Sequence, residues 1–197
     1  AVATLPGESG FVAVYIDDLI VFSDSEEEHE RHLLEVMRIC SEERLYLNNS
    51  KSKLFCKDTR YLGAVCGNNK LFMDPEKVQS ITVMPTPKSP TQVREFLGAA
   101  SFYRRWIASY AKITQPLNTL LKKKIVFAAE WAKNPELYQT AVNTIKRALT
   151  SFPVLRQPDF HKPFVIYTDA SDYAMGAALC QEHDSKMCVV AYCSRGF

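Results

Sequence analysis

The sequence predicts an α+β fold in two or three subdomains, because a β-rich part, a helical part and a second β-rich part follow one another. The two β-rich parts contain short runs of β-branched and aromatic residues separated by turn signals. The middle part has apolar residues at helical spacing. With 197 residues, 47% of them hydrophobic and 23% charged, the chain is long and apolar enough to bury a core.

The first β-rich part opens on a hairpin. Residues 11–16 (FVAVYI) and 19–22 (LIVF) are predicted strands, and a tight turn at Asp17–Asp18 joins them. Ser23 or Asp24 is then expected to cap a helix whose acidic first turn suits the helix dipole. The apolar positions of that helix are His32/Leu33, Val36, Met37 and Cys40.

The chain continues with further strand and turn signals. Residues 45–55 predict a turn followed by a strand, and residues 59–73 predict a second hairpin with its turn at 67–69 (GNN). Residues 73–81 predict a short helix with a proline near its start. Residues 84–90 contain three prolines and predict a rigid linker.

The middle part is predicted to be helical. Thr91 is expected to cap a long helix, Thr91–Lys112, and a further helix is expected at 135–150. The apolar stripe of the long helix is Val93, Phe96, Leu97, Ala100, Tyr103, Ile107 and Tyr110. Arg94, Ser101, Arg105 and Lys112 lie on its other face. Three strands, 164–171, 176–182 and 188–194, follow as an antiparallel meander.

Composition excludes several classes of protein. No apolar run approaches the ~20 residues that cross a bilayer, and residues 1–10 do not resemble a signal peptide. The six cysteines form no CxxC pair, which argues against a zinc site or a disulfide framework and favours a reducing compartment. Residues 24–43 carry eight acidic residues and two arginines, whereas residues 86–124 carry eight basic residues and one glutamate. The second segment could face a polyanion, although a solvated helix face explains either charge run.

Several ordered motifs resemble one family. YIDD (15–18) resembles the YxDD motif of reverse transcriptases, and LIVFS, EEHERHL, LNNSKSKLF and YLG extend the likeness to the palm of gypsy-type LTR-retrotransposon polymerases. DPEKVQSI, PTPKSPTQVREFLGAASFYRRWI, ITQPLNTLLKK and ALTSFPVL resemble the thumb that follows. PDFHKPFVIYTDASDYAMGAALCQ and VVAYCSR resemble the start of RNase H. The resemblance implies a partial palm at 1–73, a thumb at 74–152 and a truncated RNase H-like domain at 153–197.

The resemblance gives the carboxylates a chemical role. Asp17 and Asp18 match the catalytic metal ligands of the polymerase, and Asp169 matches the first catalytic and metal-binding carboxylate of RNase H. Each active site in the family uses two Mg²⁺ (or Mn²⁺) ions, which suit hard oxygen ligands and phosphoryl transfer. Since a hairpin turn breaks the alternation of a strand, Asp17 and Asp18 can both approach one site. The alternative is an ordinary turn, which also favours aspartate.

Further residues match the nucleotide and primer sites of the family. Tyr15 lies two residues before Asp17 and is expected on the same strand face, where it would support the nucleotide or simply pack in the core. Lys51 is expected near the incoming triphosphate, unless it is a solvated surface lysine. Tyr61, Leu62 and Gly63 match the primer grip, where glycine allows a close approach of the backbone.

The predicted thumb helix also has a binding face. Arg94, Arg105 and Lys112 are expected to contact nucleic-acid phosphates, and Gly98 is expected to let the nucleic-acid backbone approach. The alternative is a basic, solvated helix face.

The family also has residues that these motifs lack. It places a further metal-binding aspartate upstream of YxDD, and its remaining RNase H acids would follow Phe197. We therefore predict a fragment or degenerate copy of an RNA-directed DNA polymerase with RNase H, inactive by itself. The alternative is a non-catalytic nucleic-acid-binding remnant. The implied partners are RNA/DNA hybrid or DNA duplex, dNTP and the rest of the Pol polyprotein, with no membrane. The implied location is intracellular, in a cytoplasmic virus-like particle or the nucleus.

Overall fold

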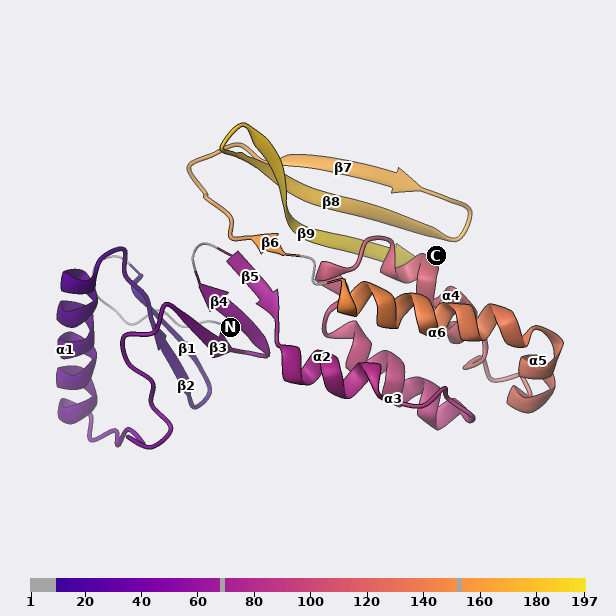
Figure 1. Ribbon diagram of the computed structural model, residues 1–197, viewed down its shortest axis with the longest axis horizontal. Coiled ribbons are helices and arrows are strands. Elements are labelled where there is room, and N and C mark those ends of the chain that lie inside the picture. Colours follow the sequence, from indigo (N-terminus) through magenta and orange to yellow (C-terminus); the bar gives the residue numbers. More distant parts are fainter. Residues whose placement is uncertain (1–9, 68–69, 152–153) are drawn as a thin grey trace. The chain divides into compact units, whose positions relative to one another are not determined.

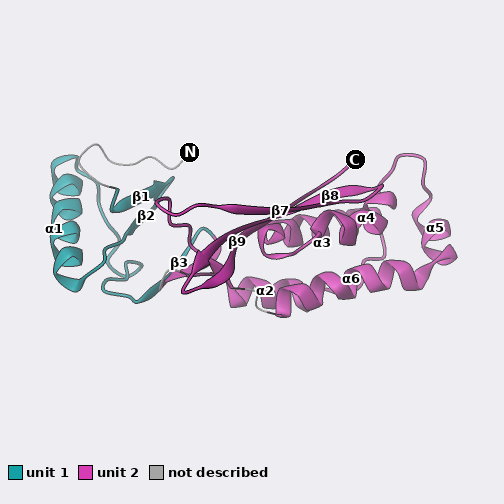
Figure 2. Ribbon diagram, turned by 90° about the horizontal axis from the view of Figure 1, so that it is seen from above, with its two compact units in different colours: residues 1–62 teal, residues 63–197 magenta. Residues whose placement is uncertain are grey.

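The computed structural model describes residues 10–67, 70–151 and 154–197 (Figure 1). It divides into two compact units, residues 1–62 and residues 63–197, which are coloured separately in Figure 2. This boundary falls within residues 59–73, for which the sequence predicts the second hairpin. The three-part division at 73/74 and 152/153 stays a prediction.

Unit 1 is built on the predicted hairpin and helix. Strands β1 (Val12–Tyr15) and β2 (Asp18–Val21) pair antiparallel, and helix α1 (Glu26–Glu42) packs against them. Ser25 is the N-cap, since its side chain accepts a hydrogen bond from the Glu28 N–H at 3.2 Å. The predicted caps, Ser23 and Asp24, were therefore wrong by one or two residues. The small core of the unit consists of Val12, Val36 and Cys40, with Phe11, Val14 and Val21 packed against it.

The strand predicted within residues 45–55 is absent from this described segment, where the chain forms turns and irregular backbone. Asn48 gives the physical reason. Its side-chain oxygen accepts from the N–H of Ser50, and its carbonyl accepts from the N–H groups of Lys51 and Ser52. Local hydrogen bonds of this kind satisfy the backbone without a partner strand. The next strand is β3 (Asp58–Tyr61).

Unit 2 contains the predicted second hairpin. Strands β4 (Ala64–Gly67) and β5 (Lys70–Met73) pair antiparallel as predicted, and residues 68–69 of their turn lie outside the described residues. A third strand, β6 (Leu155–Arg156), pairs with β5. Its sequence gave no signal for this pairing, because two residues show no periodicity and the partner strand is distant in the chain.

The helices of unit 2 are α2 (Pro75–Thr82), α3 (Pro90–Ser101), α4 (Tyr110–Thr119), α5 (Phe127–Lys133) and α6 (Pro135–Thr150), with a 3-10 turn η1 (Arg104–Trp106). The predictions for α2 and α6 are confirmed. The cap of α3 is Ser89, whose side chain accepts from the Gln92 N–H, and not Thr91, because Pro90 occupies the first helical position. Helices α4 and α6 contact each other across the core (Figure 1).

The predicted long helix Thr91–Lys112 was wrong. The chain leaves helix α3 after Ser101, forms η1 and re-enters a helix at Tyr110, after Ser109 in a left-handed conformation with a φ of 53°. The bend lets Tyr103 and Trp106 be buried and donate hydrogen bonds to the carbonyls of Gly63 and Leu71, at 3.0 and 3.3 Å. These two hydrogen bonds and the burial of both rings stabilise the bend more than further turns of a continuous helix, which the residue spacing alone favoured, would stabilise the chain.

The C-terminal meander is confirmed. Strands β7 (Val165–Ala170), β8 (Ala174–His183) and β9 (Lys186–Gly196) form an antiparallel sheet in that order (Figure 1). The sheet packs on helix α4, where the Ala111 N–H donates to the Ser194 hydroxyl at 2.9 Å. The main core of unit 2 includes Phe96, Leu117, Ile145 and Leu149. Among the described residues, no helix has the length and apolar character needed to cross a membrane.

Candidate active site and nucleic-acid interface

The turn of the first hairpin and the residue after it, Ile16–Asp18, form an acidic corner. The turn begins one residue earlier than the sequence predicts. Ile16 and Asp17 form the turn, and Asp18 is already the first residue of β2, where it pairs with Tyr15. Residues that pair directly across two strands share one face of the sheet, so Tyr15 accompanies Asp18. The expectation that Tyr15 shares a strand face with Asp17 was therefore wrong, because Asp17 belongs to the turn.

Ile16 carries backbone strain at this corner. Its φ is 56°, a left-handed value that is rare for a β-branched residue. Its side chain is also 80% exposed, so burial of an apolar group does not offset the strain. Such strain costs about 1–3 kcal/mol and concentrates at functional sites. The corner therefore holds its carboxylates in a conformation that the sequence does not favour locally.

The two carboxylates fit part of a magnesium site. Asp17 and Asp18 are both exposed. Within residues 10–67, 70–151 and 154–197, no group of three His, Cys, Asp or Glu side chains is arranged to hold a metal. Because Mg²⁺ commonly takes one or two carboxylates and fills its shell with water and substrate phosphates, the pair suits a site that other groups complete.

One histidine holds the other end of the hairpin. The ring of His32 stacks on Phe11, just before β1, with the ring centres 3.9 Å apart. Its Nδ1 lies 2.7 Å from the hydroxyl of Ser23, just after β2. The N–H of Phe22 also donates to the carbonyl of Phe11 at 2.9 Å. Helix α1 thus contacts the chain just before β1 and just after β2, at the open end of the hairpin that carries Asp17 and Asp18.

Helical spacing predicts only an apolar position for His32, so this arrangement does not follow from it. A second histidine, His29, lies 3.2 Å from the same Ser23 hydroxyl. The sequence does contain a signal for this contact. A serine follows a predicted strand, and two histidines three residues apart follow it on the predicted helix.

The predicted primer grip is a left-handed turn. Tyr61 ends β3, Leu62 and Gly63 have φ values of 48° and 73°, and β4 follows. A Cβ atom on residue 63 would also lie 2.7 Å from the Cζ atom of Phe102, so any other residue there would displace that ring. The hydroxyl of Tyr103 donates to the Gly63 carbonyl at 3.0 Å. Burial, with a contribution from the negative charge of Asp74, raises the pKa of Tyr103 to about 12, so this hydroxyl remains a donor at physiological pH.

The predicted nucleic-acid-binding residues are exposed, but they do not form one helical face. Arg94 and Gly98 lie on α3, one turn apart, whereas Arg105 lies in η1 and Lys112 on α4. The break after α3 separates them, which corrects the single face that the sequence predicted. The guanidinium of Arg105 lies over the ring of Trp106, 5.4 Å from its centre.

The remaining site residues lie on exposed parts of the chain. Lys51 is in a turn of unit 1, where its side chain is exposed. Asp169 is on β7 opposite Gly176, and every residue of that strand is exposed. Among the described residues, Asp169 belongs to no group of three His, Cys, Asp or Glu side chains that could hold a metal ion.

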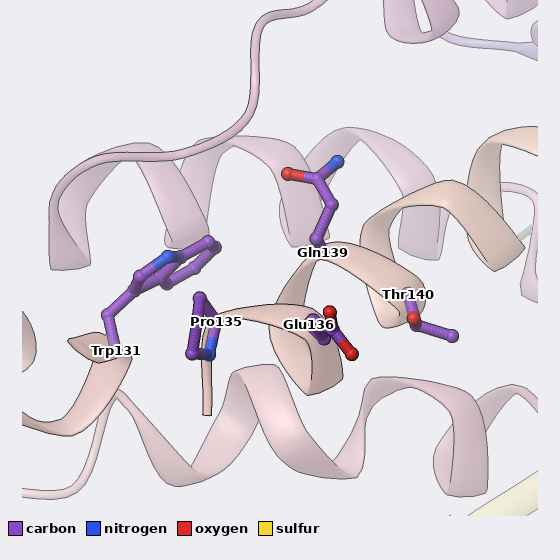
Figure 3. Close-up of a pocket in the computed structure, with 5 residues that line it drawn as sticks. All are labelled: Trp131, Pro135, Glu136, Gln139 and Thr140. Atoms are coloured by element: carbon purple, nitrogen blue, oxygen red, sulfur yellow. The ribbon is translucent and has the colours of Figure 1, made fainter. Parts of the chain in front are cut away.

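A shallow pocket of about 420 Å³ lies at the junction of α5 and α6 (Figure 3). Trp131, Pro135, Glu136, Gln139 and Thr140 line it. The Trp131 ring stacks on Tyr138 with centres 5.2 Å apart. None of the predicted site residues lines this pocket.

Comparisons with protein families agree with the motifs. Residues 3–66 match the model of the reverse transcriptase (RNA-dependent DNA polymerase) family, and residues 135–197 match an RNase H-like domain found in reverse transcriptases. Among solved structures, the foamy viral protease-reverse transcriptase dRH in complex with double-stranded DNA has a TM-score of 0.79 and 21% identity, covering 94% of this chain and 32% of that one. The same viral enzyme with an RNA/DNA hybrid gives a TM-score of 0.76, 21% identity and coverages of 94% and 25%. These likenesses show a reverse transcriptase fold that runs into an RNase H-like domain.

Two relatives make the family more specific. The chain is 37% identical over 188 residues to the retrovirus-related Pol polyprotein from transposon opus of Drosophila melanogaster. It is 34% identical over 183 residues to the transposon Tf2-3 polyprotein of Schizosaccharomyces pombe. Each match covers 92% of this chain, but only 19% and 13% of the relatives' lengths. The chain carries reverse transcriptase and RNase H-like domains and is similar to retrotransposon Pol polyproteins, as the resemblance implied; the gypsy-type lineage stays a prediction.

Proposed function

We propose that the chain supplies one part of the active site of an RNA-directed DNA polymerase and one carboxylate of its RNase H. The observation that carries this proposal is the strained corner with Asp17 and Asp18, fixed at its base by His32 and Ser23. The substrates would be a dNTP and an RNA/DNA hybrid or DNA duplex, and the parent element would act inside the cell, in a virus-like particle or the nucleus.

Each polymerase residue has a defined task in this proposal. Asp17 and Asp18 would hold Mg²⁺ or Mn²⁺, two ions in the intact site. Bound metal would neutralise charge on the attacking 3′-oxygen and on the leaving pyrophosphate. Tyr15 would support the nucleotide beside Asp18, and Lys51 would neutralise or protonate the leaving pyrophosphate. The turn at Leu62 and Gly63 would position the primer end.

We further propose that the 197-residue chain by itself does not extend a primer. Asp17 and Asp18 lack a third ligand among the described residues and should bind metal weakly. The test is extension of oligo(dT) on poly(rA) with Mg²⁺, using the purified chain beside an active reverse transcriptase. Extension that disappears in Asp17→Asn, and persists in the matched exposed variant Asp24→Asn, would contradict the proposal.

The alternative, nucleic-acid binding without catalysis, is favoured by the exposed cations Arg94, Arg105 and Lys112. Their phosphate contacts would make binding independent of base sequence and strongly dependent on salt. We expect affinity for a hybrid duplex to fall steeply between 50 and 200 mM salt, and the slope to flatten when all three residues become alanine. As a control, Arg38→Ala with Lys133→Ala removes cations that glutamates already neutralise. Binding that is insensitive to salt or to the triple substitution would refute this function.

A further inference from the structure

An additional cation lies at the grip turn, the left-handed turn formed by Leu62 and Gly63. Lys77, on helix α2, is exposed, and its ammonium lies over the ring of Phe102, 5.8 Å from the ring centre. The same ammonium is 3.6 Å from the position that a Cβ atom on Gly63 would occupy. Three segments that are separate in the sequence therefore meet at one point of unit 2.

The charge of Lys77 is not neutralised by a neighbour. In the described parts of the chain, the ion pairs that the structure contains involve other cations, and Lys77 is in none of them. The nearby carboxylate of Asp74 is buried and caps helix α2 by accepting from the Glu76 N–H at 3.0 Å. A cation held on an aromatic ring keeps its charge available to an anion on its open side.

Phe102 fixes this cation relative to the turn. Its ring covers the α-carbon of Gly63, while the adjacent Tyr103 binds the Gly63 carbonyl. Phe102 is nevertheless 51% exposed, so its ring offers apolar surface to solvent. An exposed ring, an unpaired ammonium and a left-handed backbone turn together suit a sugar-phosphate chain, which presents an apolar sugar edge and an anionic phosphate.

We propose that Lys77, Phe102 and the Gly63 turn form a phosphodiester-binding site. Lys77 binds one phosphate of the nucleic-acid strand that lies on the turn, and Phe102 packs against the adjoining sugar. This inference rests on the proposed nucleic-acid function, but it adds a contact that lies outside the basic residues Arg94, Arg105 and Lys112.

The test measures how affinity depends on salt for the full 197-residue chain and a fluorescent poly(rA)·oligo(dT) duplex. Lys77→Met keeps the aliphatic stem and removes the charge. Because one lost phosphate contact changes the slope of log K against log salt by about 0.7–0.9, we expect a slope flatter by about 1 and an affinity about five- to tenfold lower at 0.1 M salt. Lys77→Arg should restore both, since it keeps the cation over the ring.

Two further variants sharpen the test. Lys133→Ala is the matched control, because Glu130 lies 2.8 Å from that ammonium, and it should leave the slope unchanged. Phe102→Leu should lower the affinity severalfold without flattening the slope, because the charge remains. Unfolding midpoints in urea verify that each variant is folded.

The outcomes separate the two proposals. A wild-type chain that does not bind the duplex overturns both the proposed nucleic-acid binding and this inference. Wild-type binding with an unchanged slope in folded Lys77→Met overturns the Lys77 site alone. A flatter slope in Lys77→Met that Lys77→Arg reverses supports it.

Discussion

Two glycines should respond in opposite ways to substitution by alanine. In Gly63→Ala, the new residue would adopt a φ of 73°, which costs an L-residue about 1–2 kcal/mol. Its Cβ would also lie 2.7 and 2.8 Å from two atoms of the Phe102 ring. The ring must move, and the cation–π contact of Lys77, about 0.5–1 kcal/mol at an exposed site, weakens. We expect a loss of about 1.5–3 kcal/mol in the free energy of unfolding.

Gly98→Ala is the matched control. Gly98 lies inside helix α3, and a Cβ atom there would meet nothing within 4 Å. Alanine is favoured over glycine in a helix interior, so this variant should gain about 0.5–1 kcal/mol. Urea denaturation followed by the fluorescence of Trp106 and Trp131, both in unit 2, measures the two changes.

A double-mutant cycle separates the two costs at Gly63. In a Phe102→Ala background the ring is absent, so Gly63→Ala should retain only the backbone cost, about 1–2 kcal/mol. The coupling between the two substitutions should then be about 1 kcal/mol. The reasoning is refuted if Gly63→Ala is no more destabilising than Gly98→Ala, or if the coupling is zero.

Two further predictions concern unit 2. Gln181 is fully buried; its side-chain oxygen accepts from the Asp159 N–H at 2.9 Å, and its amide nitrogen donates to the carbonyls of Asp159 and Lys162 at 2.7 and 3.1 Å. Gln181→Leu should therefore lower the free energy of unfolding, measured by urea denaturation, by about 2–4 kcal/mol. A loss below about 1 kcal/mol would contradict this role. Burial raises the pKa values of Tyr103 and Tyr110 to about 12, so between pH 10 and 12 the unfolded state loses protons that the folded state keeps, and stability should fall as the pH rises through this window. Absorbance titration should show these tyrosines ionising last, and Tyr110→Phe should remove part of the late phase; early ionisation of both would contradict the prediction.

Local sequence patterns determined several elements of this protein. The first hairpin, helices α2 and α6 and the C-terminal meander follow from periodicity, caps and turn residues that lie within each segment. The motifs also identified the acidic corner and the glycine of the grip turn, because such residues are adjacent in the chain. The family resemblance, which the comparisons confirm, rests on the same local information.

The tertiary structure decided the rest. Helix α3 ends early because Tyr103 and Trp106 bond to distant carbonyls, and β6 exists only through its pairing with β5. For the same reason, no sequence pattern could place Lys77 beside Phe102 and Gly63, or His32 between the two legs of the hairpin. Spacing along a chain specifies which residues share a face of one element. Contacts between elements depend on how the whole unit buries its apolar surface, and at this grip turn those contacts fix the cation beside Gly63.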